Sequence, residues 1–341
     1  MFDKKDPNLP FFVAEISANH LGNISNAHNL IKAAAEAGAD AVKFQTYTAD
    51  TMTLDLDSLS VSNDHELWGG KRLYELYSEA QTPWEWHAEL FQHARELGLI
   101  PFSSPFDISA LQFLENLNCS IYKIASLESG DLELIRDVGM TGKPTIISTG
   151  ATELEEIDDA VSTFLGTGNQ NLTLLVCTSS YPAKPSESHL NRIHTLRERY
   201  SLNIGVSDHT LGIGVSIAAI ALGATVVEKH ITLSRNVGGL DSAFSMEPNE
   251  FKQLIQEGKN AKLGLGKSEW QILKSETESR RLRRSLYVVK DVAKNEMVSI
   301  DNIRAIRPGY GVKPKYLSFF LSKKFKNSFK AGTPLDFNMV D

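Results

Sequence analysis

Two histidines and several ionisable residues stand at points of this sequence where short apolar strands should end. His209 follows the run NIGVSD, and His230 directly follows Glu228 and Lys229. Such a cluster needs partners, because an unpaired buried charge costs on the order of several kcal/mol. Two imidazoles on neighbouring strands could bind one divalent ion and leave open positions for water or a substrate. A histidine pair held only by hydrogen bonds is the alternative.

Lysines and serines at other strand ends suit a phosphate or a carboxylate. Lys43 and Lys123 each lie near the end of an apolar run, as do Ser126 and Ser207. Ammonium and hydroxyl groups that converge on one mouth would bind an anion through charge-assisted hydrogen bonds. Ion pairs with neighbouring glutamates are an alternative role for each lysine. A desolvated lysine could also form a Schiff base with a carbonyl substrate, but this chemistry leaves the histidines without a role.

Eight short runs rich in apolar and β-branched residues predict the strands that would carry these side chains. Helical patterns separate the runs, and this alternation favours an α/β fold of the (β/α)8 TIM-barrel type. A doubly wound open sheet is the rival, but no GxGxxG follows the first run. In a barrel, catalytic side chains gather at the C-terminal ends of the strands. The runs cover residues 11–17, 40–46, 99–106, 121–126, 145–150, 172–179, 203–209 and 225–232.

Residues that favour helix ends flank several of the helical patterns. Gly38 and Gly98 follow such patterns and are expected at helix C-termini, where glycine accepts a left-handed backbone. Thr82, Asp107 and Thr152 precede others and are expected to accept hydrogen bonds from the first free N–H groups.

The gap after the second predicted strand is much longer than the others and covers residues 47–83. Long insertions after barrel strands lie at the mouth of the active site. We therefore expect this segment to form a lid or a wall.

The alternation of strands and helices stops near residue 265, so residues 1–265 are predicted to form the barrel. Residues 266–284 are highly charged and contain KSETESRRLRRS, which is more typical of a solvated linker than of an anion site. Residues 285–341 are rich in turns and short β runs. They predict a small β-rich domain.

Composition excludes several classes of protein. The net charge of -7 over 341 residues argues against a nucleic-acid partner. The longest apolar stretch, residues 214–227, contains glycines and is too short to span a membrane. The sequence MFDKKDPNLP has no apolar signal core, and Cys119 and Cys177 lie in apolar contexts typical of buried thiols. A cytoplasmic location is expected.

Nine stretches in collinear order resemble the sialic acid synthase family from about residue 11 to the C-terminus. They are EISANHLG, AGADAVKFQT, YKIAS, ISTGA, CTSSYPA, VSDHTLG, EKHITL, RRSLYV and RPGYG. The resemblance implies a TIM barrel followed by an antifreeze-like (SAF) domain that reaches the barrel of a second subunit in a domain-swapped homodimer. It also implies condensation of phosphoenolpyruvate with an N-acetylated amino sugar. The implied cofactor is Mn2+, with Mg2+ or Co2+ as alternatives, held by His209 and His230.

The resemblance also implies roles for individual residues at matching positions. The candidates for catalysis are Glu15, Glu128, His209 and His230. Which of the two glutamates handles water or protons stays open. Phosphoenolpyruvate would be bound by Lys43, Lys123, Ser126, Ser179 and Ser207. The sugar would be bound by Gln45, Tyr181, Asp241, Phe244 and Arg307, with Arg307 coming from the small domain of the partner subunit.

Two departures from the N-acetylneuraminate-forming members point to a different sugar. Ser242 replaces their usual histidine, and Ser179 replaces an asparagine. Both speak against N-acetylmannosamine. The stretches QTYTADTMTLD, LWGGKRLYELY, TPWEWH, GGLDSAFSMEP and RPGYGVKPKYL resemble the branch of the family that uses 2,4-diacetamido-2,4,6-trideoxy-L-altrose, with the N-acetylneuraminate and legionaminic acid precursors as alternatives. A 6-deoxy sugar needs a less polar pocket, and Phe244, Tyr47 and Trp68 are predicted to wall it.

Overall fold

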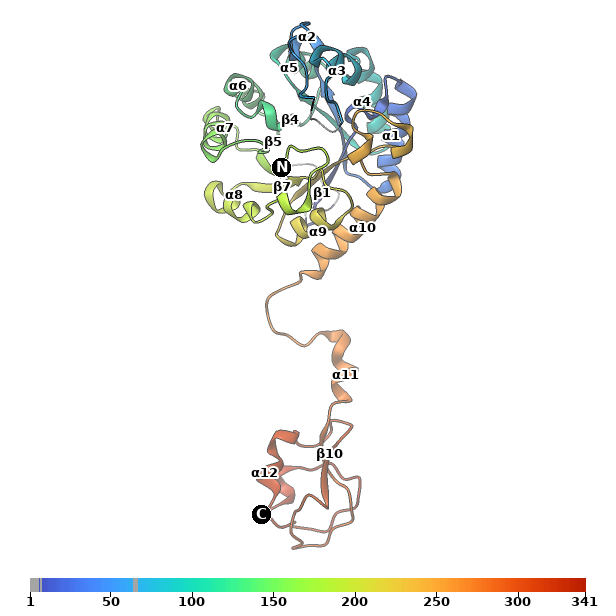
Figure 1. The fold of residues 1–341 in the computed structure, drawn as a ribbon. Helices are drawn as coiled ribbons and strands as arrows, with labels where there is room; N and C mark the ends of the chain where they lie inside the picture. The colour runs from blue at the N-terminus through green and yellow to red at the C-terminus, as the bar shows by residue number, and fades with distance from the viewer. Residues whose placement is uncertain (1–5, 7, 64–66) are drawn as a thin grey trace. The chain divides into compact units, whose positions relative to one another are not determined.

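The chain folds into two compact units, residues 1–266 and residues 267–341 (Figure 1). The structure is a computed structural model that describes residue 6, residues 8–63 and residues 67–341. Each unit has its own hydrophobic core.

The first unit is a closed barrel of eight parallel strands, each hydrogen-bonded to the next along the chain and β8 to β1. Each of the eight predicted runs contains one strand, so the TIM-barrel prediction is confirmed. Most runs extend past the observed strand, because their last polar residues lie in the turns that follow. The strands are β1 Phe11–Glu15, β2 Ala41–Thr46, β3 Ile100–Pro105, β4 Tyr122–Ile124, β5 Thr145–Ser148, β6 Leu172–Cys177, β7 Asn203–Ser207 and β8 Val226–His230.

Helices that connect the strands surround the barrel (Figure 1). Their apolar faces pack on the buried outer side of the sheet and complete the core, as the architecture requires. They are α1 Ile24–Ala37, α4 His87–Glu96, α5 Ile108–Asn116, α6 Leu132–Met140, α7 Leu154–Gly166, α8 Arg192–Tyr200, α9 Gly214–Ala221 and α10 Pro248–Gly264.

Three of the expected helix-end residues act as predicted. Gly38 ends α1 with a left-handed φ of 92°, and Gly98 follows α4 with a φ of 75°. The Asp107 carboxylate accepts hydrogen bonds from the N–H groups of Ser109 and Ala110 at 3.1 Å, so it caps α5.

The two threonines predicted to cap helices do not. A short 3-10 turn, Trp84–Trp86, separates Thr82 from α4. Thr152 lies one residue too early, because Glu153 is the N-cap of α7 and its N–H donates to the Glu156 carboxylate at 2.7 Å. Thr152 instead donates to the carbonyl of Thr149 at 2.9 Å.

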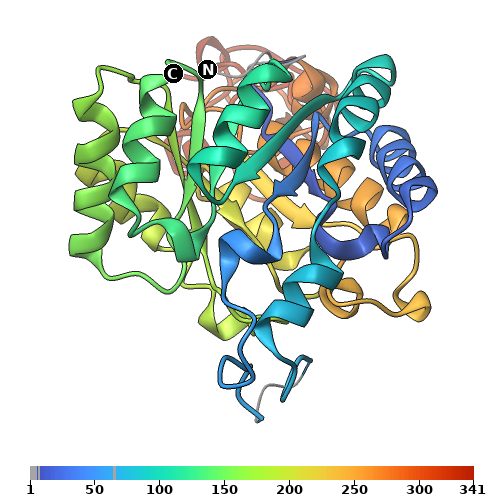
Figure 2. The ribbon, with the colours of Figure 1, turned by 90° about the horizontal axis from the view of Figure 1, so that it is seen from above.

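The long segment after β2 contains two short helices, α2 Ala49–Met52 and α3 Leu73–Ala80. Arg72 joins the segment to itself through ion pairs with Asp55 at 2.8 Å and Glu75 at 2.6 Å. Figure 2 shows the segment, coloured blue to cyan, at one end of the barrel. Residues 64–66 of the predicted lid or wall lie outside the described residues.

The second unit holds a two-stranded antiparallel sheet, β9 Ser285–Val288 with β10 Ile303–Ile306, and isolated antiparallel bridges such as Tyr287 to Pro334 and Val292 to Phe329. Its core includes Leu286, Val288, Phe320 and Phe325. The prediction of a small β-rich domain is confirmed. Two short helices, α11 Thr277–Arg281 and α12 Leu317–Phe320, belong to the same unit.

Cys119 and Cys177 are buried free thiols, as predicted. No helix among the described residues has the length and apolar character that crossing a bilayer demands.

Two buried histidines other than His209 and His230 are expected to make folding sensitive to acid. Burial lowers the pKa of His20 and of His87 from 6.5 to about 4. The unfolded chain therefore binds protons between pH 6.5 and 4 that the folded chain excludes. Each ring contributes stability that is complete above pH 6.5 and is lost as the pH falls towards 4, on the order of 3 kcal/mol in total per ring.

We expect the free energy of unfolding, measured in urea, to fall by a few kcal/mol between pH 7 and pH 5. His87 accepts a hydrogen bond from Thr46 at 2.8 Å. The His87→Gln variant keeps an acceptor there but cannot be protonated, so its pH dependence should be shallower. Equal pH slopes in the two proteins would contradict this assignment.

Candidate active site

A layer of four buried charged side chains lies inside the barrel at the C-terminal ends of its strands. The Lys43 ammonium is 2.9 Å from a Glu15 oxygen and 3.5 Å from a Glu228 oxygen. The Lys123 ammonium is 3.9 Å from the same Glu228 oxygen, which also accepts a hydrogen bond from Ser207 at 3.1 Å. The two lysines therefore form the ion pairs that were considered as their alternative role. These ion pairs also fix the lysines at the mouth of the barrel.

These charges shift one another's pKa values. Burial alone would raise the pKa of Glu228, but Lys123 and Lys43 together hold it below the usual range. Burial raises the pKa of Glu15, and Lys43 only partly offsets this. Burial lowers the pKa of Lys123 despite the attraction of Glu228, whereas the two glutamates keep Lys43 protonated. The surroundings therefore favour the charged forms of Lys43 and Glu228 and disfavour the charged forms of Glu15 and Lys123.

Buried hydroxyl groups surround the Lys123 side of this layer. Ser126 accepts a hydrogen bond from the N–H of Gly150 at 3.0 Å. The hydroxyls of Ser104 and Ser148 are buried and have no hydrogen-bond partner among the described residues. Since buried hydroxyls are almost always paired, these orphans indicate that a polar ligand belongs here. Sequence reasoning missed Ser104, Ser148 and Gly150.

Strand register could have found the two missed serines. Ser104 pairs with Gln45 on β2, and Ser148 follows Ile146, the partner of Lys123, by two residues. Both therefore point to the same inner face as the lysine.

The two histidines come together as predicted. Their ring centroids are 5.3 Å apart. This separation matches two imidazoles that share one metal in adjacent positions at about 2.1 Å each. His209 donates from Nδ1 to the Thr178 carbonyl at 2.9 Å, which leaves Nε2 as a free acceptor. The Nδ1 of His230 is buried and has no hydrogen-bond partner among the described residues.

The protonation of the histidines bears on metal binding. Burial, together with His209 and Lys43, lowers the pKa of His230 well below 6.5, so this ring is neutral. Burial opposes protonation of His209, but Cys177, whose Sγ lies 3.9 Å away, raises its pKa. A proton would compete with any metal that binds at His209. Within the described part of the chain, no group of three or more His, Cys, Asp or Glu side chains is arranged to hold a metal, so the fit consists of these two ligands.

A cavity of about 390 Å³ opens above the charged layer. Its size suits a small sugar. Residues of the segment after β2 line one side of it, so the predicted wall is present in the described residues. The lining comprises Ser17, Gln45, Tyr47, Met52, Val61, Trp68, Leu73, Leu76, Tyr77, Ala80, Phe106, Ala125, Ser126, Leu127, Glu128, Tyr181, His230, Leu240, Asp241 and Phe244.

Aromatic rings connect the cavity to the histidines. Phe244 is buried, with its ring 5.0 Å from His230 and 5.1 Å from Tyr181. Tyr181 also packs 4.5 Å from His209 and 5.8 Å from Trp68. This side of the cavity is apolar.

Polar groups also line the cavity. Gln45 donates to Glu15 and to Ser17, both at 3.1 Å, and Ser17 donates to Asp241. Burial raises the pKa of Asp241, and burial also raises the pKa of Glu128, whose Oε2 has no hydrogen-bond partner among the described residues.

The remaining predicted residues differ in where they lie. The Ser179 hydroxyl is beside Gly150, close to Ser126. Ser242 is buried, and its hydroxyl donates to the backbone carbonyl of Gly238. Arg307 follows β10 in the second unit, where it is exposed, and its role stays a prediction.

The class of protein follows from this geometry. A TIM barrel whose strand ends place two lysines, buried hydroxyls and two neighbouring imidazoles beside a cavity of about 390 Å³ has the layout of an enzyme that binds an anion beside a second substrate. The cavity lies at the catalytic end of the fold.

Comparisons with known proteins identify the family. The NeuB family model matches residues 30–270, and the SAF domain model matches residues 283–341. The chain belongs to the NeuB family of nonulosonic acid synthases.

Relatives align with the chain over nearly its whole length. A pseudaminic acid synthase of Helicobacter pylori is 43% identical, covering 97% of this chain and 98% of its own. An N,N'-diacetyllegionaminic acid synthase of Campylobacter jejuni is 34% identical, covering 93% of this chain and 96% of its own. The crystal structure of an N-acetylneuraminic acid synthetase from Leptospira borgpetersenii is 31% identical with a TM-score of 0.72, covering 80% of this chain and 90% of that one.

Proposed function

We propose that this enzyme condenses phosphoenolpyruvate with 2,4-diacetamido-2,4,6-trideoxy-L-altrose to give pseudaminic acid and phosphate. The observation that carries this proposal is the pairing of a lysine and hydroxyl site with an apolar-walled cavity directly beside it. Similarity supports the choice of product, because a pseudaminic acid synthase is 43% identical and a diacetyllegionaminic acid synthase is 34% identical.

Phosphoenolpyruvate brings a phosphate and a carboxylate, and the inner layer supplies their partners. Lys43 and Lys123 provide positive charge, and Ser126, Ser179 and Ser207 provide hydroxyl donors. The unpaired hydroxyls of Ser104 and Ser148 join this set.

The reaction joins C3 of phosphoenolpyruvate to the aldehyde carbon of the open-chain sugar. Water then adds at C2, and cleavage of the C2–O bond releases phosphate and leaves the keto acid. His209 and His230 would hold Mn2+, which as a Lewis acid polarises the aldehyde. Burial raises the pKa values of Glu15 and Glu128, and each carboxyl group is a candidate to hold or release a proton in the reaction.

The sugar occupies the cavity above this layer. Gln45, Asp241 and Tyr181 bind its polar groups, and Phe244 contacts its 6-methyl end together with Tyr47 and Trp68. A buried aromatic wall suits a deoxy sugar, because a methyl group gains from apolar contact where a hydroxyl would lose its hydrogen bonds.

Replacing Phe244 by alanine should raise the KM for the trideoxy sugar about tenfold or more, since it removes an apolar contact to the substrate. Phe244 is 2% exposed and lines the cavity. The KM for phosphoenolpyruvate, which binds below, serves as the internal control. Steady-state kinetics with each substrate varied would check this, and an unchanged KM for the sugar would remove Phe244 from the binding site.

The SAF domain completes the site in a domain-swapped homodimer, in which Arg307 of one subunit binds the N-acetyl group of the sugar held by the other. Arg307 is exposed, and a guanidinium can hydrogen-bond an amide oxygen through more than one N–H group. Mixing inactive Arg307→Ala chains with inactive His209→Asn chains should restore part of the activity, because hybrid dimers contain one intact site. Mixtures that stay inactive despite subunit exchange would contradict the swap.

The deciding experiment measures phosphate release from phosphoenolpyruvate with Mn2+, with the trideoxy sugar and N-acetylmannosamine offered in parallel. Release with the trideoxy sugar alone is expected. Release with N-acetylmannosamine would keep the chemistry but overturn the interpretation of Ser242 and Ser179. Metal-independent turnover trapped by borohydride with pyruvate would instead assign Schiff-base chemistry to a lysine such as Lys123, whose pKa burial lowers.

A further inference from the structure

A buried ion pair joins the two residues that directly precede His209 and His230. Lys229 lies 3.0 Å from the Asp208 carboxylate, and both side chains are 1% exposed. The pair belongs neither to the charged layer inside the barrel nor to the cavity above it. It links β8 to the turn after β7, the two segments that carry the histidines.

The Asp208 carboxylate is fully satisfied. It accepts hydrogen bonds from the N–H of Thr210 at 2.9 Å, from the Thr210 hydroxyl at 2.7 Å and from the Ser216 hydroxyl on α9 at 2.6 Å. Lys229 also donates to the Thr210 carbonyl at 2.6 Å. The network therefore fixes the turn on both sides of His209.

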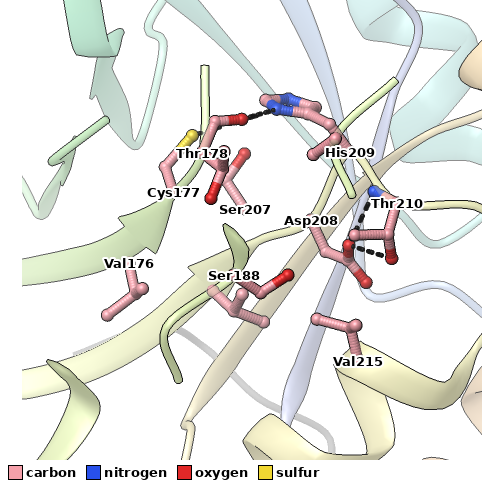
Figure 3. A pocket seen from close by; sticks show the side chains of 11 residues that line it. Val176, Cys177, Thr178, Ser188, Ser207, Asp208, His209, Thr210 and Val215 are labelled. Carbon is pink, nitrogen blue, oxygen red and sulfur yellow. Dashed lines mark hydrogen bonds between the residues drawn. The ribbon is translucent and has the colours of Figure 1, made fainter. Parts of the chain in front are cut away.

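Side-chain direction separates this network from the site itself. Figure 3 shows the side chains of Asp208 and His209 pointing to different sides, with Asp208 turned towards Thr210 and Val215. Lys229 and His230 alternate in the same way along β8, as strand geometry requires. The ion pair thus faces the helical layer while the imidazoles face the mouth.

We propose that the Asp208–Lys229 pair is a positioning device that sets the spacing of the two metal-binding histidines. The inference rests on the proposed function of His209 and His230 as metal ligands. A rigid tie immediately behind both ligands holds the imidazoles at the 5.3 Å separation that a shared ion needs before the ion arrives. Without the tie, binding of the ion has to order the turn as well.

The test is Mn2+ affinity of the metal-free protein, measured by calorimetry and by the electron paramagnetic resonance signal of free Mn2+. Asp208→Asn keeps the shape of the side chain but loses the ion pair. We expect its Mn2+ dissociation constant to rise about 10- to 100-fold, the range typical for groups that orient metal ligands. Phosphoenolpyruvate affinity, measured without metal, should stay within about twofold, because Lys43 and Lys123 do not contact the pair.

A control variant separates positioning from general destabilisation. Glu115→Gln removes the ion pair with Lys143 at 2.6 Å, on elements distant in sequence from β7 and β8. It should change the melting temperature but leave Mn2+ affinity unchanged. If Asp208→Asn fails to fold, Ser216→Ala removes one hydrogen bond to the same carboxylate, and a several-fold weaker affinity is expected.

Each outcome is decisive. Wild-type Mn2+ affinity in the folded variants would overturn the positioning role and leave the proposed function intact. Failure of the wild-type protein itself to bind Mn2+ would overturn both. Equal losses in Mn2+ and phosphoenolpyruvate affinity would show a general disturbance of the mouth and also contradict the inference.

Discussion

Replacing Gly150 by alanine should abolish high-affinity phosphoenolpyruvate binding while the barrel stays folded. A Cβ atom at this position would lie 2.9 Å from the Ser126 hydroxyl, 3.2 Å from the Cys177 sulfur and closer still to the Ser179 hydroxyl. The serine hydroxyls would have to move to make room, and we expect this to disturb the proposed anion site. Each charged hydrogen bond lost is worth about 1.5–3 kcal/mol, so the dissociation constant should rise on the order of 100-fold.

A matched glycine shows whether this effect is local. Gly166, the last residue of α7, is exposed, and a Cβ atom added there would meet no neighbour within 4 Å. Gly166→Ala should leave phosphoenolpyruvate binding unchanged and stabilise the fold slightly. Calorimetric titration of phosphoenolpyruvate into both variants and the parent checks the prediction. Unaltered affinity in a folded Gly150→Ala protein would mean that the hydroxyls near Gly150 do not bind the substrate.

The barrel could be predicted from the sequence because its strands are short apolar runs that alternate with helical patterns. Reliance on composition also explains why most predicted strands extended past the observed C-terminal ends. Residues such as Ser17 and Ser126 continue a run in composition, yet they lie in 3-10 turns where their side chains face the mouth. The polar residues at the ends of the runs were thus better evidence for the site than for the strands.

The charged residues of the candidate site were predicted from the sequence, whereas its small uncharged residues were missed. Burying an ionisable side chain costs free energy, so such residues near strand ends predict a functional site. Lys43, Lys123 and His230 were predicted for this reason. Ser104 and Ser148 are small residues inside apolar runs, and only the pairing of Ser104 with Gln45 shows that it shares their face. Register depends on long-range strand pairing, which composition and spacing do not reveal.

The Asp208–Lys229 pair was hidden for a related reason. The sequence places each residue directly before a histidine, and strand alternation predicts only that Lys229 points away from the mouth. The two charges meet behind the histidines because β7 and β8 are neighbours in the closed barrel. In the mechanism that we propose, the inner layer would bind the substrate and the outer pair would hold the histidines that face it.

Replacing Lys43 by methionine should destabilise the barrel by about 3–5 kcal/mol, the usual cost of removing one partner from a buried ion pair. Lys43 neutralises both Glu15 and Glu228, and its side chain is 5% exposed. Without it, two buried carboxylates share only the more distant Lys123. The loss should shrink at acidic pH, because Glu15, whose pKa burial already raises, would take up a proton.

Two comparisons make this second prediction specific to the buried layer. The double variant Lys43→Met with Glu15→Gln removes one charge of each sign and should recover much of the lost stability, although not activity. Lys71→Met removes a lysine whose ion pair with Glu79 has a similar length of 3.0 Å but is solvent-exposed, so unfolding should change little. Urea unfolding of the three variants measures these differences. If Lys43→Met were no less stable than Lys71→Met, the charged layer would not be the electrostatic unit that the distances between Glu15, Lys43 and Glu228 indicate.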